Sequence, residues 1–495
     1  MRFRTCLTYL CFVMETKQNH NEVPALLEII KKQGQEILKL QQQLEQLLRN
    51  TYGRKSERFV VNPSQAALPF DIPSSVEPEK QKETITYTRE KKSATSKHKG
   101  RMPLPDHLER VDIIIPPSVD TTGLVKIGEE ITEQLEHEPG KLFVKRFIRP
   151  KYAKVNGEGI LIGALPSSPI EKGIPGPALL ALILIQKYVD HLPLYRQIEQ
   201  FKRLGVEIPS STMSDWVALC CNLLDPLYEA LKKKILQSGY LQADETTIKV
   251  LDKNIKGKTH LGYYWVYRDP VSGLVLFDYR KGRGREGPAD ILKDFTGYLQ
   301  SDGWNAYENF DKNNVTLIHC MAHARRYFEH ALSENKQVCE IALNQIQKLY
   351  SIERQAREGS LSHTQRYELR QRESVPVLNQ MHQWLKETIL KVPPQSASGK
   401  ALAYSCSRWE KLMLYATDGK LEIDNNLVEN SIRPIAIGRK NYLFAGSHIS
   451  AQRAAMIYSL LGTCKLKGIN PYEWLKNILQ ILPDYKANRL EELLP

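Results

Sequence analysis

The chain has few cysteines, and none of them are paired in a metal-binding or disulfide-forming motif. Its eight cysteines are scattered, without a CxxC spacing. This pattern provides no disulfide framework and favours a reducing, cytoplasmic environment. Long apolar runs are also missing. The run at residues 178–185 is followed at once by Gln186 and Lys187 and is too short to span a bilayer. We expect a buried helix there and no membrane partner.

Several catalytic motifs are absent as well. The sequence has no GxxxxGK[ST] phosphate loop, no GxSxG turn and no HExxH helix, so the chemistries that depend on these motifs have no support. Positive charge, by contrast, is in excess. The 495 residues include 69 Lys and Arg against 56 Asp and Glu, a net charge of +13. A basic chain of ordinary globular composition favours an anionic partner.

The N-terminal part is expected to hold three segments. Residues 1–20 lack a cleavage site after their basic and apolar start and are interpreted as a disordered or mis-started N-terminus. Residues 21–50 carry a heptad pattern, which predicts a coiled coil and a homo-oligomer; the alternative is an amphipathic helix docked on its own protein. Residues 51–108 form a basic polar linker, whose cationic run at 89–101 is either a tether for an anionic partner or a solvated spacer.

Two modules are expected next. Residues 109–172 alternate β-branched and polar side chains and predict a small strand-rich module. Residues 173–235 predict helices, two of which are joined by a Gly-containing turn as in a helix-turn-helix. Under that interpretation Ser210 or Ser211 caps the second helix, and Ser214 enters a major groove of DNA. The alternative is an ordinary helical hairpin.

The rest of the chain predicts a multidomain α/β protein. Residues 236–332 follow the order strand, strand, strand, helix, strand, helix, strand, helix. Residues 333–420 interrupt this pattern with helices, one of which carries an apolar stripe at Leu378, Met381, Leu385 and Ile389. Residues 421–446 hold a final core helix, and residues 447–495 a C-terminal helical region. The helical stretch therefore looks like an insertion.

The most informative feature is a repeated hexapeptide. GYLQAD at residues 239–244 and GYLQSD at residues 297–302 differ at one position in six, and both are predicted to end a strand with an acid. Neighbouring strands would bring Asp244 and Asp302 together, and two unpaired carboxylates repel unless a cation lies between them. We expect a divalent metal there. The alternative is that both acids terminate turns. Glu245 should face away and is interpreted as a structural acid.

A third acid lies on a helix after the insertion. Asp424 is the expected N-cap of this helix, and Pro434 is expected to end it near Arg433. Asn426, Glu429 and Arg433 are spaced three and four residues apart and form one polar stripe. Glu429 is therefore a candidate metal ligand, with Asn426 as a supporting residue.

Two aspartates and one glutamate on such a framework are what two-metal phosphoryl transfer requires. The expected cofactor is Mg²⁺, for which Mn²⁺ can substitute. Cys320 and His323 form half of a zinc site without a second half, so zinc is not expected and both are assigned a supporting structural role. Some cations could face DNA phosphates, although pairing with carboxylates or solvent is the alternative. These cations are Arg325, Arg326, Arg433, Arg439 and Lys440.

These segments together resemble one family. YLQADETTIKVL, YLQSDGWNAY, HCMAHARRYF, IDNNLVENSIRPIAIGRKNYLFAGS and SLLGTCKLKGINPYEWL are similar, in this order, to segments of the DDE transposases of the insertion sequence 66 family. The resemblance implies a ribonuclease-H-like core interrupted by a helical insertion. It implies an enzyme that binds double-stranded DNA at transposon ends and target, cuts the ends and joins their 3′-OH groups to the target with Mg²⁺. Asp244, Asp302 and Glu429 would be its catalytic triad, in a cytoplasmic, nucleoid-associated protein.

One departure from the family concerns zinc. Members of the family carry a cysteine zinc-binding module ahead of the helical region, whereas Lys154 and Gly157 stand where a CxxC pair is expected. Zinc is therefore not expected in this module, and its role in recognising DNA ends is open. Companion proteins of the element are also left open. Two alternatives remain for the whole chain: a nuclease or resolvase that does not join ends, and a catalytically silent DNA-binding protein.

Overall fold

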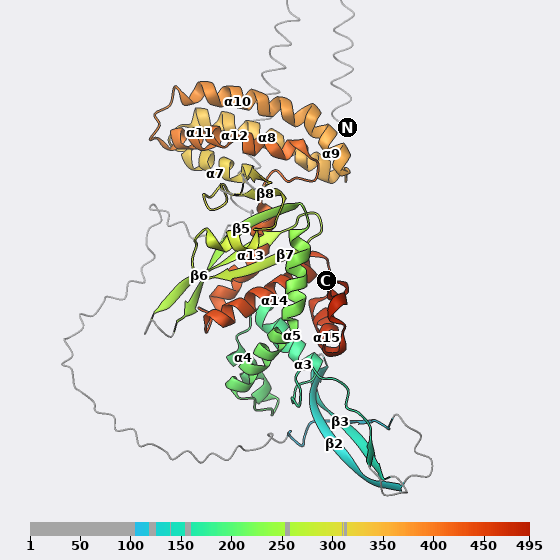
Figure 1. The fold of residues 1–495 in the computed structure, drawn as a ribbon. Coiled ribbons are helices and arrows are strands. Elements are labelled where there is room, and N and C mark those ends of the chain that lie inside the picture. The colour runs from blue at the N-terminus through green and yellow to red at the C-terminus, as the bar shows by residue number, and fades with distance from the viewer. Residues whose placement is uncertain are drawn as a thin grey trace, which may run out of the picture. The chain divides into compact units, whose positions relative to one another are not determined.

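The computed structural model describes residues 104–117, 125–138, 140–153, 160–252, 258–308, 310 and 314–495. The predicted coiled coil, the cationic run at 89–101 and the positions Lys154 and Gly157 lie outside these residues. The described residues form two β-sheets and many helices, which confirms the multidomain α/β class (Figure 1). Among the helices that the structure describes, none combines the length and apolar character that crossing a bilayer requires.

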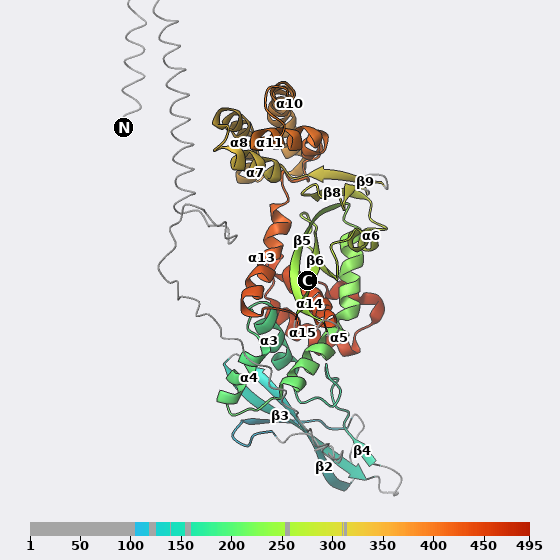
Figure 2. The same ribbon diagram turned by 90° about the vertical axis from the view of Figure 1, so that its left-hand side faces the viewer.

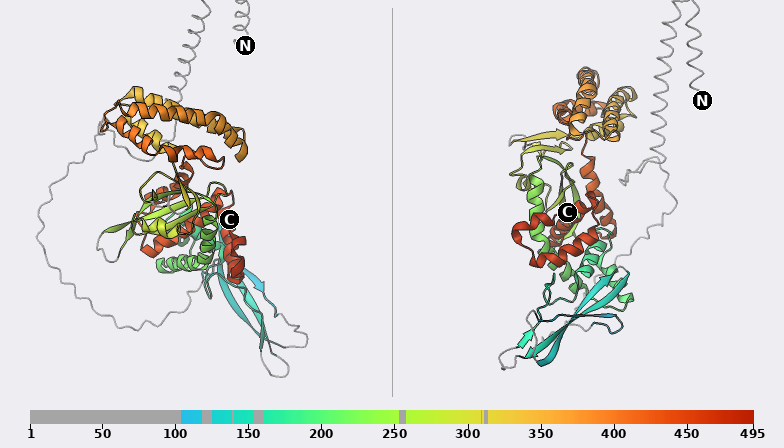
Figure 3. Two further views of the ribbon diagram at one scale, coloured as in Figure 1. Left: turned by 45° about the horizontal axis from the view of Figure 1, so that its top comes forward. Right: turned by 90° about the vertical axis from the view of Figure 1, so that its right-hand side faces the viewer.

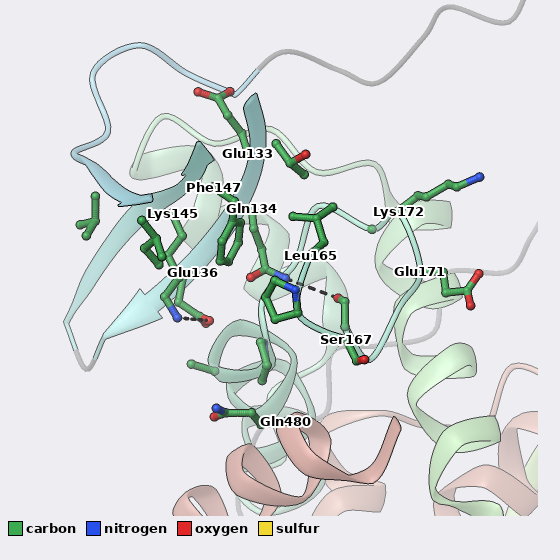
Figure 4. A pocket seen from close by; sticks show the side chains of 18 of the residues that line it. Glu133, Gln134, Glu136, Lys145, Phe147, Leu165, Ser167, Glu171, Lys172 and Gln480 are labelled. Atoms are coloured by element: carbon green, nitrogen blue, oxygen red, sulfur yellow. Dashed lines mark hydrogen bonds and ion pairs between the residues drawn. The ribbon is translucent and has the colours of Figure 1, made fainter. Parts of the chain in front are cut away.

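The first sheet has the order β1-β3-β2, with β4 pairing with β3. Its strands are β1 (Arg110–Ile114), β2 (Val125–Glu138), β3 (Lys141–Ala153) and β4 (Ile160–Ile162). Glu136 of β2 joins this sheet to helix α3 (Pro177–Tyr188). Its carboxylate, 3% exposed, accepts the N–H of Leu179 at 3.1 Å and the amine of Lys145 at 3.0 Å (Figure 4). A carboxylate in the first turn satisfies a helix donor that has no partner within the helix, so the two elements are held together.

Two further helices follow α3, namely α4 (Leu194–Arg203) and α5 (Ser210–Leu236). The prediction that Ser210 or Ser211 caps α5 is wrong, because Pro209 is the N-cap and the helix starts at Ser210 itself. The C-terminal half of α5 packs on the second sheet. There the hydroxyl of Tyr228 donates to the carbonyl oxygen of Phe277 at 2.8 Å. Helix α5 therefore belongs both to the helical hairpin and to the core that supports the second sheet.

The second sheet has five strands in the order β7-β6-β5-β8-β9. They are β5 (Tyr240–Leu251), β6 (Thr259–Arg268), β7 (Val275–Arg280), β8 (Gly297–Ser301) and β9 (Val315–His319), with helix α6 (Glu286–Ile291) between β7 and β8. The pairs β5–β6 and β6–β7 are antiparallel, whereas β5–β8 and β8–β9 are parallel. Gly297 allows β5 and β8 to approach, since it has a φ of +119° and a Cβ there would lie 2.2 Å from the carbonyl oxygen of Gly239.

Helices cover both faces and the outer edge of this sheet. Helix α13 (Asn426–Asn441) lies on one face and α5 on the other (Figure 2). Helix α14 (His448–Leu466) covers the edge strand β7: the hydroxyl of Ser459 accepts the N–H of Phe277 at 2.7 Å, and that of Thr463 accepts the N–H of Val275 at 3.2 Å. An exposed edge strand would leave such donors without partners. The chain ends with α15 (Pro471–Ile481), η4 (Leu482–Asp484) and η5 (Ala487–Leu493).

A bundle of helices separates β9 from α13 in the sequence (Figure 3). Its elements are α7 (Met321–Ala331), α8 (Lys336–Glu358), α9 (His363–Leu369), η2 (Arg370–Ser374), α10 (Val375–Ile389), α11 (Ala397–Ser407), α12 (Trp409–Met413) and η3 (Leu414–Thr417). Leu378, Met381 and Leu385 of the predicted stripe are fully buried in a core of this bundle. The predicted helical insertion thus packs together with α7 in a core that also includes Tyr240 of β5 and Ile318 of β9.

The remaining described elements share one other large core. Buried residues of the first sheet, of α3 to α5, of the second sheet and of α13 to α15 belong to a single hydrophobic cluster. The predicted modules 109–172, 173–235 and 447–495 therefore divide the sequence more finely than the packing does. The reason is that these segments also pack against one another, as α3 does on β2 and on α15, and α14 on α5.

A cluster of buried charged residues stabilises the helical insertion. Glu353 of α8, 1% exposed, accepts hydrogen bonds from Arg366 and from the fully buried Arg370. Although burial by itself raises the pKa of Glu353, the two guanidiniums hold it below its ordinary value. Arg370 also donates at 2.7–2.8 Å to three carbonyl oxygens, those of Tyr415, Asp418 and Leu421. These contacts fix the path by which the chain returns from the insertion towards α13.

Candidate catalytic site

The two copies of the hexapeptide lie side by side in the second sheet. Strands β5 and β8 are parallel neighbours, with Gln242 opposite Gln300. The prediction that these strands are adjacent is therefore confirmed. Asp302 follows the last residue of β8, as expected, but Asp244 does not end its strand. Strand β5 continues to Leu251 because β6 extends the antiparallel ladder beyond the point where β8 stops.

Asp244 lies among other carboxylates. Burial and the nearby charges of Glu245, Glu429 and Asp302 raise the pKa of Asp244 to about 8, although a hydrogen bond from the N–H of Glu245 at 2.8 Å opposes this shift. The charge of Asp244 therefore interacts with those of Asp302 and Glu429, and these three residues are here called the acidic triad. Carboxylate oxygens are the ligands that Mg²⁺ and Mn²⁺ prefer.

The acidic triad does not enclose a ready-made metal position. In the part of the chain that the structure describes, no group of three or more His, Cys, Asp or Glu side chains is arranged to hold a metal ion. Asp302 instead uses Oδ1 to accept the N–H of Trp304 at 2.9 Å, which closes the turn after β8. The chemistry of the donor set fits a divalent cation, but bringing all three carboxylates onto one ion requires Glu429 to change its partner.

That partner is Arg326 of helix α7. Its Nη2 lies 3.0 Å and 3.2 Å from the two carboxylate oxygens of Glu429, and its Nη1 lies 3.1 Å from Nε2 of His323. Although burial lowers the pKa of Arg326, the negative charges of Glu429 and Asp244 raise it overall. A guanidinium is thus hydrogen-bonded to one member of the acidic triad. It also connects α7, the helix that precedes the predicted insertion, to the helix that carries Glu429.

A buried network of amides sets the position of α13. The side-chain nitrogen of Gln242 donates to Gln300 at 2.9 Å and to the carbonyl oxygen of Asp424 at 2.8 Å. Its side-chain oxygen accepts the N–H of Val428 at 3.2 Å, one residue before Glu429. Gln242 and Gln300 are fully buried, so these bonds are protected from water. The repeated glutamines therefore position the third acid.

Two predictions about α13 are wrong. Asn425, not Asp424, is the N-cap, and the helix continues through Pro434 to Asn441. Asp424 instead accepts the N–H and the side-chain amide of Asn426, and also the hydroxyl of Tyr350 at 2.8 Å. Pro434 is tolerated inside the helix because packing against β5 and β6 keeps the helix in place, and proline removes only one of its hydrogen bonds.

The cations that were expected to face DNA have different surroundings. Arg325 pairs with Glu329 at 2.7 Å, and Arg326 with Glu429. Arg439 donates to the backbone and, at 3.0 Å, to the hydroxyl of Thr247 on β5, and burial lowers its pKa. Arg433 is exposed. Arg439 and Lys440 lie in the last turn of α13 rather than in a loop. The structure thus places the cations on two helices, α7 and α13.

Cys320 is the N-cap of α7 and is completely buried. Burial raises the pKa of its thiol to about 12, and its sulfur accepts the N–H of Asn425 at 3.4 Å. A neutral, buried thiol of this kind is a packing residue rather than a metal ligand. With His323 turned towards Arg326, both residues support the two helices beside the acidic triad.

The helix-turn-helix interpretation also expected Ser214 to enter a groove of DNA. Ser214, the fifth residue of α5, is exposed and donates its hydroxyl to the carbonyl oxygen of Ser210 at 2.8 Å. Entry of this turn into a groove of DNA stays a prediction.

A cavity of about 1090 Å³ lies away from the acids. It is bordered by β2, β3 and the segment that leads to α3, with Glu133, Phe147 and Lys172 among its lining residues (Figure 4). No member of the acidic triad lines it. Its lining mixes both signs of charge, so the cavity by itself indicates no ligand.

Sequence reasoning missed several residues that organise the site. The hexapeptide contained Gln242 and Gln300, and a glutamine at the same place in both copies was the available signal for a buried network. Glu353 and Arg370 carried no such signal, because they are far apart in the sequence and pair only in the folded insertion.

Comparison with known proteins identifies the family. Residues 172–453 match the family described as Transposase IS66 family, and residues 459–495 match the IS66 C-terminal element. Residues 39–113 match the family described as Transposase C of IS166 homeodomain. These matches place the chain among the transposases. It belongs to the IS66 family, as its motifs suggested.

Relatives match nearly the whole chain. The uncharacterised protein y4qI of Sinorhizobium fredii is 34% identical over 498 aligned residues, which cover 96% of this chain and 91% of that protein. The uncharacterised protein y4hP of the same organism is 32% identical over 492 residues, with 93% and 88% covered.

Proposed function

We propose that this transposase binds the ends of its insertion sequence, cleaves the DNA there and joins the freed 3′-OH ends to target DNA. The observation that carries this proposal is the acidic triad. Strands β5 and β8 are parallel neighbours, and the charge of Asp244 interacts with those of Asp302 and Glu429. Repelling carboxylates on a rigid sheet are costly for folding alone, and a divalent cation would offset their repulsion.

The topology supports a ribonuclease-H-like core. In the five-stranded mixed sheet, Asp244 lies in β5 and Asp302 directly follows the adjacent strand β8, while α13 carries the glutamate and comes after the helical insertion in the sequence. This is the arrangement that the family resemblance led us to expect. Function then depends on the site and not on the fold, because one fold can host many activities.

Within this proposal Asp244, Asp302 and Glu429 would hold Mg²⁺ or Mn²⁺. Such ions, when bound, activate the attacking oxygen and stabilise the leaving oxygen of a phosphodiester. The protein's own residues orient the ligands: Gln242 holds the start of α13, and the N–H of Trp304 holds Asp302. Cations on α7 and α13 would hold the DNA backbone, whose phosphates attract Lys and Arg irrespective of sequence.

A strand-transfer assay tests this function. A labelled DNA end of the element is incubated with the protein, target DNA and either Mg²⁺ or EDTA. We expect joined products longer than the labelled end with Mg²⁺ and none with EDTA, because metal removal leaves only repelling carboxylates. Cleavage without joining would indicate a nuclease or resolvase. Binding without either reaction would indicate a DNA-binding protein that has no catalytic activity.

Replacing Arg326 tests how the acidic triad receives a cation. We expect Arg326→Gln to bind Mn²⁺ more tightly in the absence of DNA, because the ion no longer competes with a guanidinium for Glu429. The ion pair is partly exposed, so its loss is worth about 1 kcal/mol, or roughly fivefold in affinity. Calorimetric titration with Mn²⁺ measures the change.

Arg325→Gln is the matched control for this titration. Arg325 is the adjacent residue on the same helix, and it pairs with Glu329 instead of a triad member. Its variant should bind Mn²⁺ like the unmodified protein. Equal Mn²⁺ affinity of the Arg326 variant and this control would contradict the proposal that Arg326 and the metal ion compete for Glu429.

A further inference from the structure

The loop between β7 and α6 is a second cationic feature beside the acidic triad. Its sequence, KGRGR at residues 281–285, places three cations and two glycines in five residues, all of them exposed. Within the described part of the chain, no ion-pair partner is found for Lys281 or Arg285. The loop therefore presents positive charge to solvent that the fold does not neutralise.

Arg283, at the centre of this loop, is held in place from two sides. Its Nε donates to a carboxylate oxygen of Glu245 at 2.9 Å, and Nη2 donates to the same oxygen. Its guanidinium carbon also lies 4.2 Å from the ring centre of Trp304. The Trp304 ring is itself stacked on the fully buried Trp265, with the ring centres 5.6 Å apart. An arginine supported by a carboxylate and an aromatic ring loses less conformational freedom when it binds a ligand.

Both supports of Arg283 are direct neighbours of the catalytic candidates. Glu245 adjoins Asp244 in β5, and the N–H of Trp304 is hydrogen-bonded to Asp302. The contact with Trp304 therefore places the guanidinium near Asp302, one member of the acidic triad. The Arg283 side chain remains 47% exposed, whereas the Glu245 side chain is only 7% exposed. A guanidinium has five N–H donors, and the bonds to Glu245 come from Nε and Nη2, so Nη1 is left for a ligand.

We propose that residues 281–285 form a phosphate-binding loop, in which Nη1 of Arg283 contacts a backbone phosphate of the DNA strand beside the acidic triad. Guanidinium groups match phosphate geometry, and the two glycines let the loop backbone approach a DNA strand closely. Lys281 and Arg285 add charge on either side. Glu245 thereby acts as a positioning residue for Arg283, not as a fourth metal ligand. This inference rests on the proposed function, since it takes the acidic triad as the place where DNA lies.

The salt dependence of DNA binding tests the loop. Affinity for a fluorescein-labelled linear duplex is measured by anisotropy at several salt concentrations with Ca²⁺ present. Each lost phosphate contact should reduce the slope of log affinity against log salt by about 0.9. We expect this reduction, with weaker binding, for Arg283→Gln. Arg283→Lys should keep most of the slope but lose affinity, because it retains the positive charge and loses the planar set of N–H donors that a guanidinium offers to phosphate.

Two further variants complete the experiment. Arg489→Gln is the matched control, since Arg489 is also an exposed arginine paired with a single glutamate, and it should leave the slope unchanged. Lys281→Gln combined with Arg285→Gln removes side chains without described ion pairs, so it should fold normally and still reduce the slope.

The outcomes separate the loop from the proposed function. An unchanged slope in either Arg283→Gln or the double variant would overturn the proposed phosphate-binding role of the loop, even if the protein joins DNA ends. A reduced slope in a protein that never joins ends would support the loop and count against strand transfer. If Arg283 only neutralises Glu245, the slope of Arg283→Gln should equal that of the Arg489 control, which would also overturn the proposal.

Discussion

Asp302→Asn is expected to abolish metal-dependent joining of 3′ ends while leaving the binding of DNA ends largely intact. The amide keeps an oxygen that can accept the N–H of Trp304, so the turn after β8 should persist. What the variant loses is a charged metal ligand. Metal stabilisation of a transition state is worth several kcal/mol, so joining should slow by on the order of a thousandfold. Strand-transfer and anisotropy assays on the same preparation measure the two effects.

Asp269→Asn is the matched control for this substitution. Asp269 also follows a strand, β6, and its carboxylate also accepts an N–H two residues later, that of Val271 at 2.8 Å. It is not a member of the acidic triad. Its variant should therefore join ends at a rate close to that of the unmodified protein. Full joining activity in Asp302→Asn would refute the catalytic role of Asp302. A loss of joining activity in both variants would indicate that an altered turn, and not a missing metal ligand, causes the effect.

Arg370→Ala is expected to cause the largest loss of stability, and to do so in the helical insertion. The change removes a fully buried guanidinium and leaves Glu353 with one cation instead of two. It also leaves three carbonyl oxygens without this donor. Removing one partner of a buried ion pair costs about 3–5 kcal/mol. Hydrogen exchange of amides in α8 to α12, followed as a function of urea, measures the local free energy of unfolding.

Arg372→Ala provides the comparison within the same turn. Arg372 is two residues away, 68% exposed, and pairs with the adjacent Glu373 at 2.9 Å. An exposed pair of this kind contributes at most about 1 kcal/mol. Amide protection should therefore change little in this variant. Similar losses of protection in the Arg370 and Arg372 variants would show that the buried cluster does not hold the insertion together.

Much of the catalytic framework could be predicted because it is local in the sequence. Alternating and apolar patterns predicted β5 to β9 in their order, and the repeated hexapeptide predicted that β5 and β8 are neighbours. The length of β5 was not predictable in the same way. Asp244 lies within the strand because β6 pairs beyond it, and the extent of that pairing depends on a partner strand and not on the residues around Asp244.

The ends of α13 show the same limit. Asp424 is a strong local signal for the start of this helix, and Pro434 for its end near Arg433. Packing on the sheet and the bond from Val428 to Gln242 outweigh them, so the helix starts later and continues through Pro434. Tertiary contacts can exceed the local cost of a proline when many of them act on one helix.

The sequence alone determined which residues are available for chemistry: two aspartates in a repeated motif, one glutamate on a polar helix stripe, and an excess of cations. These follow from spacing and composition, which are properties of the chain before it folds. Only the tertiary structure decided which charges meet. It places Arg326 on Glu429, Arg283 between Glu245 and Trp304, and Arg370 on Glu353. Each of these contacts joins residues that are distant in the sequence, and their energies depend on burial and distance, which a sequence does not contain.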